Sequence, residues 1–509
     1  GLEMRHHSHY ADPTTVGKLD HFHSFETCAG VLCMSPTRFF SGCLIICLVV
    51  STSARADSWP QFRGSGGAGH YASNLPLPTQ VGPDQNVLWK IPLPPGHASP
   101  VLTEERIFLA AVKGGELVTI GLDRKSGKLL WEAKATAQKL EQIHRIGSHA
   151  QCTPVTDGER VISFFGSSGM YCYNLDGALL WKRLMGPFNN DFGSGTSPII
   201  VGDLVILCQD HDTDSFLLAV DKQTGKTVWK TDRSEFPRNY CSPVLWETDG
   251  RQQIVIAATM RVVGYDLSTG KEAWTVRGIS RAVCMTPVVS ADNHLVVAGW
   301  AGGGDLEGRI SVQPFDEVAP LRDANGNGVL EESELEENSP LLPRFSQVDR
   351  DKTGTITKRE YEYYRRLFDR AENKVLKIRP GGRGDLTETH VVWEYRRFVP
   401  FCASPLEINN CVFTIKDGGI LSCLDSASGK RVRNRRLQAN GSYYSSPVTG
   451  DGKIYLVDQR GGLTVVSADR SCQILHHVDL EEEVYGTPAL VDGQIYLRTN
   501  GHLYCFGKP

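Results

Sequence analysis

A Ser-Pro or Thr-Pro step followed by an apolar segment recurs eight times in this chain of 509 residues. The steps begin at Ser99, Thr153, Ser197, Ser242, Thr286, Ser404, Ser446 and Thr487. Their prolines are separated by 54, 44, 45, 44, 118, 42 and 41 residues, and a period of about 40–45 residues is typical of a four-stranded propeller blade. The sequence therefore predicts an all-β fold, an eight-bladed β-propeller of four-stranded antiparallel blades, with a small α-helical insertion in the long interval.

The second half of the repeat has its own pattern. An apolar strand ends in Asp, a Ser/Thr-Gly-Lys turn follows, and the last strand carries a tryptophan, as in segments 122–131, 220–229 and 265–274. Asp can accept hydrogen bonds from the amides of the turn, and the glycine can take the positive φ that such a turn requires. We expect the large tryptophan rings to cover the junctions between neighbouring blades.

The two ends of the repeat array are incomplete. Trp89 precedes the first Ser-Pro step, and the final strand pattern, from His502 to Phe506, has no tryptophan strand after it. A blade made from both ends removes the open edges that a linear array would leave. We expect the two ends to share one blade.

Two further segments indicate a family. They are Trp59-Pro60-Gln61-Phe62-Arg63-Gly64 and the Gly-Asp-Leu-Thr-Glu-Thr-His stretch at 384–390. With the repeats, the chain from about 59 to 509 resembles the pyrroloquinoline-quinone (PQQ)-repeat, quinoprotein-dehydrogenase-like propellers, and within them a bacterial exported subfamily with an inserted EF-hand pair. These propellers include dehydrogenases and non-catalytic outer-membrane assembly lipoproteins, so the resemblance implies the fold and leaves the activity open.

The insertion, expected at 315–372 within the fifth blade, contains two twelve-residue loops with the spacing of EF-hand calcium ligands. In the first loop the ligands expected for Ca²⁺ are Asp323, Asn325, Asn327, Val329, Glu331 and Glu334. In the second loop they are Asp349, Asp351, Thr353, Thr355, Thr357 and Glu360. The alternative is a decayed pair that keeps the glycine turns and binds no metal, and Pro320 makes the first entering helix imperfect.

The second loop has threonine at positions 5 and 9, so we expect weaker or more water-dependent binding there. The resemblance to EF-hands implies a short β-contact between Leu330 and Ile356 and an exit helix over 361–368. Extracellular hands bind calcium at roughly 10⁻⁴ to 10⁻³ M, which favours a structural ion over a signalling one.

The N-terminal part is typical of an exported protein. Residues 1–33 show no regular hydrophobic period, and we expect them to be a non-native or disordered extension. Residues 34–56 have the pattern of a signal peptide, with Arg38, an apolar run at 39–50 and Ala54-Arg55-Ala56 as the cleavage site. The run is too short to span about 30 Å of hydrocarbon comfortably. We therefore expect a periplasmic or extracellular protein, with no membrane span after cleavage.

Charge and cysteine content give little information about binding partners or disulfides. The 54 basic and 58 acidic residues nearly cancel, and no long run of either sign is present, so nothing indicates nucleic-acid binding. Ten cysteines follow the cleavage site, and export would permit disulfides. Their spacing does not define a connectivity, and buried free thiols explain them equally well.

Residues just before the Ser/Thr-Pro steps should surround the mouth of the central channel, as in related propellers. Those chosen as a binding site for a cofactor or ligand are His97, His149, Gln151, Arg238, Asn239, Tyr240, Arg281, Tyr444 and Tyr485. Arginines and tyrosines together can bind an anionic, planar ligand such as PQQ through charge-assisted hydrogen bonds and stacking. The alternative is that these residues are polar only because the channel mouth is exposed to solvent, and that they bind no ligand.

No catalytic residue is assigned from the sequence. Asp191 and Asp210 lie near strand ends and are interpreted as turn residues, and the chain has no adjacent cysteine pair. The leading hypothesis is an exported, calcium-binding scaffold for an unknown protein or small-molecule ligand at the channel. The alternatives are a PQQ-dependent dehydrogenase that oxidises an alcohol or sugar, and an envelope-assembly factor resembling the outer-membrane assembly propeller lipoproteins.

Overall fold

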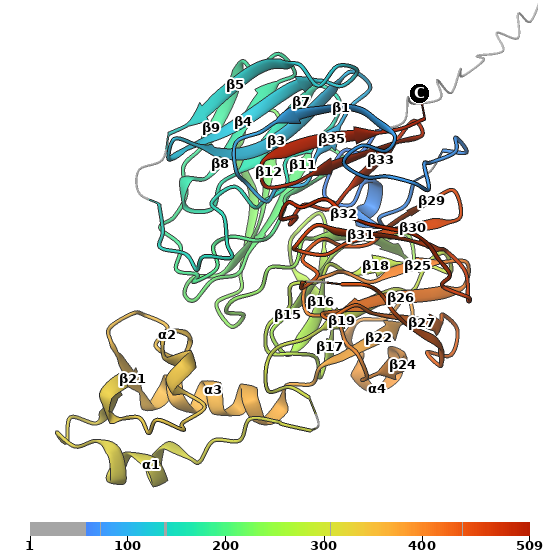
Figure 1. Cartoon of the computed structure of the whole chain (residues 1–509). Helices are drawn as coiled ribbons and strands as arrows, with labels where there is room; N and C mark the ends of the chain where they lie inside the picture. Colours follow the sequence, from blue (N-terminus) through green and yellow to red (C-terminus); the bar gives the residue numbers. More distant parts are fainter. Residues whose placement is uncertain (1–57, 72, 137–139, 306, 440, 509) are drawn as a thin grey trace, which may run out of the picture. The chain divides into compact units, whose positions relative to one another are not determined.

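The computed structural model describes residues 58–71, 73–136, 140–305, 307–439 and 441–508. Over these residues the chain forms eight consecutive antiparallel sheets of four strands (Figure 1). The predicted eight-bladed propeller is therefore confirmed. The expected extension at 1–33 lies outside the described residues, as does the expected signal peptide at 34–56.

The first four blades follow the spacing of the first four repeats. Blade 1 contains β2 (Val101–Leu102), β3 (Arg106–Lys113), β4 (Glu116–Asp123) and β5 (Leu129–Ala135). Blade 2 contains β6 (Val155–Thr156), β7 (Arg160–Phe164), β8 (Met170–Asn174) and β9 (Leu179–Arg183). Blade 3 contains β10 (Ile199–Val201), β11 (Leu204–Gln209), β12 (Phe216–Asp221) and β13 (Thr227–Asp232). Blade 4 contains β14 (Val244–Thr248), β15 (Arg251–Ala258), β16 (Arg261–Asp266) and β17 (Glu272–Arg277).

The other four blades contain the insertion and the closure of the ring. Blade 5 contains β18 (Val288–Val289), β19 (Leu295–Gly299), β22 (Lys374–Ile378) and β24 (Val391–Tyr395). Blade 6 contains β25 (Leu406–Ile408), β26 (Cys411–Lys416), β27 (Ile420–Asp425) and β28 (Arg431–Arg436). Blade 7 contains β29 (Val448–Gly450), β30 (Lys453–Val457), β31 (Gly462–Ser467) and β32 (Ile474–Asp479). Blade 8 contains β33 (Ala489–Val491), β34 (Gln494–Arg498), β35 (His502–Phe506) and β1 (Val87–Pro92).

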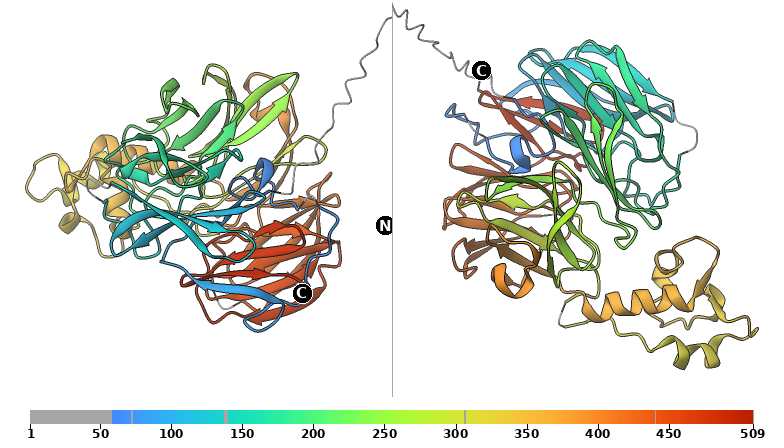
Figure 2. Two further views of the ribbon diagram at one scale, coloured as in Figure 1. Left: turned by 90° about the horizontal axis from the view of Figure 1, so that it is seen from above. Right: turned by 180° about the vertical axis from the view of Figure 1, so that it is seen from behind.

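Blade 8 is made from both ends of the repeat array, as expected. β1 pairs antiparallel with β35, and Trp89 lies opposite Cys505. Figures 1 and 2 show the blue β1 beside the red β35. The ring is thus closed by backbone hydrogen bonds, which leave no unpaired sheet edge between its first and last blades.

The segment between β19 and β22 contains most of the helices (Figure 1). Its elements are α1 (Phe315–Arg322), β20 (Val329–Glu331), η3 (Glu332–Glu334), η4 (Leu342–Arg344), α2 (Phe345–Val348), β21 (Thr355–Thr357) and α3 (Lys358–Arg370). The 3₁₀ helices η1 (Ser65–Gly67) and η2 (Gly166–Ser168), α4 (Thr387–His390) and the short β23 (Gly384–Asp385) complete the set. β23 runs parallel to β17 and covers its outer edge.

Within the insertion, a short antiparallel ladder joins the two predicted loops. β20 pairs with β21, and Leu330 lies opposite Ile356, the contact that the resemblance to EF-hands implied. Both side chains are fully buried. α3 includes the expected exit helix, and Thr357 caps it by accepting a hydrogen bond from the amide of Glu360. Pro320 lies inside α1, as its position in the sequence indicated.

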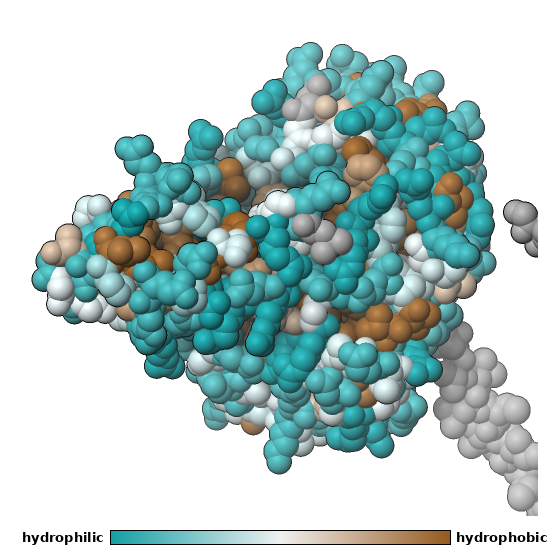
Figure 3. All heavy atoms as spheres, turned by 90° about the horizontal axis from the view of Figure 1, so that it is seen from below, coloured by the Kyte–Doolittle hydropathy of each residue, from teal (hydrophilic) through white to brown (hydrophobic). Residues whose placement is uncertain are grey.

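The core lies between neighbouring blades, on strands that are buried on both faces. β11 and β12 have almost no exposed residue, whereas the outer strand β13 is mostly exposed. The face drawn in Figure 3 is mostly hydrophilic, with hydrophobic side chains in separate patches. None of the helices in the described parts of the chain has the length and apolar character needed to cross a bilayer.

The tryptophans of the outer strands cover the junctions between blades, as expected. The indole Nε1 of Trp181 donates to the backbone oxygen of Lys222 in the next blade, at 2.9 Å. Gly225 belongs to the Asp-x-x-Thr-Gly-Lys turn that begins at Asp221, and its φ is 69°. A Cβ atom there would lie 2.6 Å from the Trp181 ring, so the turn needs glycine for its conformation and for the ring.

Replacing Gly225 by alanine is expected to destabilise the protein by about 2–5 kcal/mol. The positive φ costs an alanine roughly 1–2 kcal/mol. Displacing the Trp181 ring adds a cost of roughly 1–3 kcal/mol. Gly202→Ala is the matched control, because Gly202 has a φ of 57° and a Cβ there would meet nothing within 4 Å. Urea unfolding should show a larger loss of unfolding free energy for Gly225→Ala than for Gly202→Ala. Equal losses would exclude a role for the tryptophan contact.

Candidate functional site

The Ser/Thr-Pro steps are joined to one another around the central axis. Among the described residues, seven backbone amides of these Ser and Thr residues donate to the hydroxyl of the equivalent residue in the next blade, at 2.9–3.0 Å. For example, the amide of Thr286 donates to the Ser404 hydroxyl, across the insertion. The repeat therefore needs a hydroxyl at this position as well as a strand start, and the hydroxyls hold the inner segments in register.

The residues two positions before these Ser and Thr residues form a ring. All eight of them line one cavity of about 510 Å³. They are His97, Gln151, Gly195, Tyr240, Cys284, Cys402, Tyr444 and Tyr485. We call these residues the inner ring. The volume lies within the roughly 300–1,000 Å³ typical of small-molecule sites.

Aromatic rings meet around part of the inner ring. His97 stacks on Tyr485, with ring centroids 3.7 Å apart, and Tyr444 lies 5.5 Å from Tyr485 by the same measure. Burial lowers the pKa of His97 to about 3, so the imidazole is neutral at ordinary pH. This side of the cavity is therefore a flat, uncharged surface suited to a planar ring.

Seven of the nine residues chosen from the sequence line this cavity, and His149 and Asn239 do not. His149 Nε2 bonds the backbone oxygen of Glu141 at 2.8 Å. Asn239 is buried and donates to Asp210 and Thr259, both at 3.1 Å. Asn239 precedes the inner-ring residue Tyr240, and successive side chains of an extended segment point to opposite sides. Counting back two positions from each Ser/Thr-Pro step would have left Asn239 out and found Cys284 and Cys402.

Other lining residues come from segments that the sequence did not place at the channel. The insertion supplies Pro343, Arg344, Gln347, Tyr364 and Leu367, from η4, α2 and α3. We call these five residues the roof. Further aromatic rings come from Phe192 and Phe401 in connections between blades, from Phe62 before β1 and from Trp300 directly after β19. No local pattern marks these positions, because their contacts join segments far apart in the sequence.

Arg238 lines the cavity but its charge is balanced. It donates to both oxygens of Asp212, to Asp191 at 2.8 Å and to the backbone oxygen of Ser346 in α2, also at 2.8 Å. Burial acts to lower the pKa of Arg238, but the Asp212 carboxylate outweighs burial and raises it. Asp191 lies in a turn, as interpreted, and its side chain is also an ion-pair partner between propeller and insertion.

Arg281 and Arg344 also line the cavity, and no described carboxylate forms an ion pair with either. The Arg281 guanidinium donates to the Gly302 backbone oxygen and to Gln347 Oε1, at 3.3–3.4 Å. Burial lowers the pKa of Arg281 to about 10, so it keeps its charge at neutral pH. None of the described residues that line the cavity is Asp or Glu. Arg281 and Arg344 therefore give the lining of the cavity a net positive charge.

Asp210 is buried beside the cavity and paired with Arg233. Its Oδ1 accepts from Arg233 Nε at 2.8 Å and its Oδ2 from Nη2 at 2.7 Å, and both side chains have no exposed surface. Burial acts to lower the pKa of Arg233, but Asp210 outweighs it and raises the pKa. The interpretation of Asp210 as a turn residue is therefore wrong, because the carboxylate balances a buried cation.

The two predicted calcium loops share one hydrogen-bond pattern. The carboxylate at position 1, Asp323 or Asp349, accepts from the amides of positions 5 and 6 at 2.8–3.1 Å. The carboxylate at position 12, Glu334 or Glu360, accepts from the amides of positions 2 and 9 at 2.8–3.0 Å. These bonds turn the acidic side chains toward the inside of each loop, where oxygen ligands for Ca²⁺ are required.

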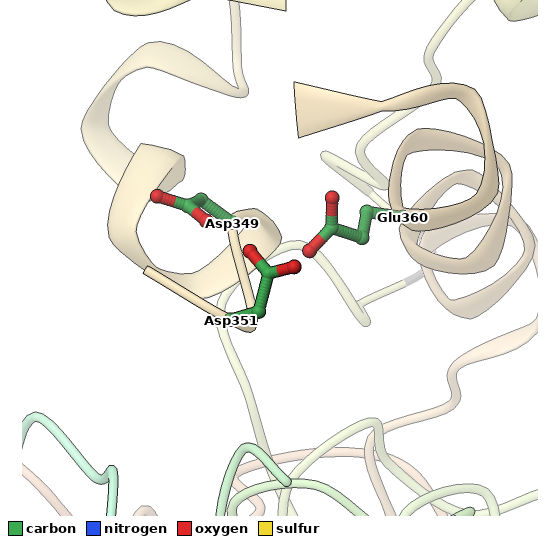
Figure 4. Close-up of side chains that lie close together, drawn as sticks. All are labelled: Asp349, Asp351 and Glu360. Atoms are coloured by element: carbon green, nitrogen blue, oxygen red, sulfur yellow. The ribbon is translucent and has the colours of Figure 1, made fainter. Parts of the chain in front are cut away.

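In the second loop, three carboxylates converge. One oxygen from each of Asp349, Asp351 and Glu360 lies within 4.8 Å of the others, and Figure 4 shows the three side chains close together, with Asp351 and Glu360 facing each other. In the first loop, Glu331 instead accepts from the side-chain amides of Asn325 and Asn327. The donor set is all oxygen in both loops, and it suits a hard cation.

The second loop also contacts the propeller through its non-ligand positions. Arg350 Nε donates to the backbone oxygen of Asp212 at 2.9 Å. Lys352 Nζ lies 3.3 Å from the carboxylates of Asp191 and Asp212, the two acids that hold Arg238. The roof residues flank this loop on both sides, in η4 and α2 before it and in α3 after it. The loop, the acidic pair and the roof are therefore one connected structure.

Comparisons with known proteins agree with the fold. The family model described as outer membrane protein assembly factor BamB matches residues 82–183 and 121–300. A search of curated protein sequences gives no match. Among solved structures, BamB from Moraxella catarrhalis is 14% identical with a TM-score of 0.52, over 83% of this chain and 97% of that one. The computationally designed protein Ika8 is 11% identical with a TM-score of 0.50, over 82% and 97%.

A third solved structure, a europium-containing methanol dehydrogenase, is 10% identical with a TM-score of 0.46, over 89% of this chain and 98% of that one. At such identities, the likeness of the first two structures shows the propeller fold alone.

Proposed function

We propose that this PQQ-repeat propeller is an exported, calcium-binding scaffold that holds an anionic ligand with an aromatic ring in its central cavity. The observation that carries the proposal is a partly buried positive charge without a carboxylate partner among the described residues, placed in a cavity lined by several aromatic rings. A buried cation is costly unless it is paired. A bound carboxylate would supply the missing partner of Arg281.

The ligand class follows from the lining. Arginine binds carboxylates through charge-assisted hydrogen bonds in a fixed planar geometry, and Arg281 and Arg344 offer two such groups. The flat face made by His97 and Tyr485 offers stacking for a ring. PQQ, a planar quinone with three carboxylates, is the member of this class that the repeats themselves indicate.

Calcium has a structural part in this proposal. Residues Asp323 to Glu334 and Asp349 to Glu360 are the proposed ligand loops, as expected from the sequence. Calcium in the second loop would draw Asp349, Asp351 and Glu360 together and fix the two helices that flank the loop. Since these helices carry the roof residues, calcium is proposed to hold the roof over the ligand.

Replacing Arg281 by alanine is expected to weaken PQQ binding about 10- to 100-fold. A hydrogen bond to a charged group contributes roughly 1.5–3 kcal/mol, and each 1.4 kcal/mol is about tenfold in affinity. The measurement is quenching of tryptophan fluorescence by PQQ in the full chain with calcium present, because Trp300 lines the cavity. Arg431→Ala, on the exposed strand β28, is the matched control.

The same titration tests the proposed function. Saturable binding of PQQ below roughly 1 μM supports it, and reduction of an electron-accepting dye on addition of an alcohol or sugar would make the protein a dehydrogenase. If the wild-type chain does not bind PQQ at about 100 μM, and if benzene polycarboxylates also do not bind, the anionic-ligand proposal is rejected.

The second candidate function is that of an envelope-assembly factor. The match of the BamB family model to residues 82–183 and 121–300 favours it. The partner would then be a protein, bound by the propeller in the cell envelope. Cross-linking in cells followed by affinity purification should recover outer-membrane proteins in this case, and their absence would exclude it.

A further inference from the structure

Two neighbouring positions of the inner ring are cysteines, Cys284 in blade 5 and Cys402 in blade 6. Each stands two residues before its Ser/Thr-Pro step. The amide of Thr286 donates to the hydroxyl of Ser404 at 3.0 Å, and this bond holds the two segments side by side. Elsewhere on the inner ring the same relation brings His97 onto Tyr485, at 3.7 Å between centroids. The inner ring thus allows neighbouring side chains to come into contact.

The two thiols are neighbours on the inner ring. The neighbouring Cys284 and burial raise the pKa of Cys402 well above its ordinary value. Both are partly exposed, whereas the other eight cysteines of the described residues are buried. Of the described cysteines, only these two line the cavity. Two thiols are thus available from one side to a small ligand that reaches the inner ring.

The surroundings select the kind of ligand. No oxygen ligand from Asp or Glu lines the cavity, so hard cations such as Ca²⁺ and Mg²⁺ find no suitable set there. Thiolates are soft ligands and prefer soft metals such as Cu⁺. Arg281 lines the same cavity without an ion-pair partner among the described carboxylates, and its positive charge favours the negative charge of two thiolates.

We propose that Cys284 and Cys402 form a two-thiol site for a soft, monovalent cation of the Cu⁺ type. On binding, both thiols lose their protons to solvent and two metal–sulfur bonds form, so that the bis-thiolate complex carries one negative charge. No electron is transferred and no oxidant is required. The site is separate from the calcium loops, and it does not rest on the anionic ligand proposed above.

The test titrates the reduced full chain with Cu⁺ under anaerobic conditions, against bathocuproine disulfonate as competitor. We expect one tightly bound Cu⁺ per chain, with thiolate-to-copper charge-transfer absorption in the near ultraviolet. Cys284→Ser and Cys402→Ser should each lower the affinity at least about 100-fold, because each removes one of two ligands, and outer-shell partners alone are worth about 10- to 100-fold. Cys423→Ser, within a second group of neighbouring thiols, is the matched control and should change nothing.

A measurement on the wild-type chain covers the case in which the serine variants do not fold. Bound Cu⁺ should protect Cys284 and Cys402 from alkylation by iodoacetamide, as read by peptide mass spectrometry. The proposal is overturned if Cu⁺ protects other cysteines instead. It is also overturned if binding persists in both variants, or if the two thiols are found as a disulfide that remains after reduction with dithiothreitol.

Discussion

Replacing Glu360 by glutamine is expected to abolish calcium binding at the second loop at millimolar calcium and to weaken ligand binding in the cavity. Glu360 is the position-12 carboxylate, which EF-hand loops use as a bidentate ligand. The loss of calcium affinity should be at least about 100-fold, because outer-shell partners of a metal site alone are worth about 10- to 100-fold. Isothermal titration of the full chain with calcium measures it.

The effect on the cavity follows from the contacts of the second loop. Arg350 and Lys352 bind the propeller at Asp212 and Asp191, and the flanking helices carry Gln347 and Tyr364 into the roof. Coupling between two such sites is typically 1–3 kcal/mol, or about 5- to 150-fold in affinity. Calcium should therefore tighten PQQ binding by a factor in this range in the wild-type chain, and by none in Glu360→Gln.

Glu334→Gln is the control, since it removes the same ligand position from the first loop. Among the described residues, neither Asp323 nor Glu334 has a hydrogen bond to the propeller, and no residue of that loop lines the cavity. Glu334→Gln should lose one calcium ion and keep calcium-dependent PQQ binding. Equal effects of the two variants on PQQ binding would contradict the proposed link between the second loop and the roof.

Replacing Asp210 by asparagine is expected to destabilise the protein by about 3–5 kcal/mol, the usual cost of removing one partner from a buried ion pair. Arg233 would then keep its charge without exposed surface and without a carboxylate. The amide can accept only one of the two hydrogen bonds that Asp210 accepts from Arg233. Urea unfolding of the full chain gives the free energy of unfolding.

Asp203→Asn is the control for this variant. The Asp203 side chain is 83% exposed and lies 3.5 Å from Lys222, and surface pairs of this kind contribute about 0–1 kcal/mol. A loss below about 1 kcal/mol for Asp210→Asn would mean that the pair is more hydrated than its burial indicates.

The fold was predictable from the sequence because its signals are local. Each Asp-x-x-Ser/Thr-Gly-Lys turn, such as the one with Gly225, and each outer tryptophan, such as Trp181, belongs to one short segment and recurs along the chain. The closure of blade 8 was predictable because the last strand pattern has no tryptophan strand after it, whereas Trp89 precedes the first Ser-Pro step. The calcium loops were found for the same reason, since their twelve positions are contiguous, although metal binding itself stays a prediction.

The site was predictable only in part. Most channel residues were predictable because they precede the Ser/Thr-Pro steps. Asn239 was wrongly included, because successive side chains of an extended segment point to opposite sides and only Tyr240 lines the channel. The hydroxyl-to-amide bonds explain why those steps contain Ser or Thr, and a strand signal alone does not reveal them. The roof was not predictable, because the contact of Arg350 with Asp212 joins positions 138 residues apart. The pairing of Asp210 with Arg233 likewise has no signal in the sequence.

The pairing of β1 with β35 has a consequence for the folding of the newly synthesised chain. β1 is synthesised before the seven blades that follow it, yet its partner strand is among the last described residues to leave the ribosome. Until then the growing array exposes two unpaired edges, and such nonlocal closure is intrinsically slow. If the chain is exported, as proposed above, late closure would keep it open during passage through a narrow translocation pore, and the ring would close afterwards.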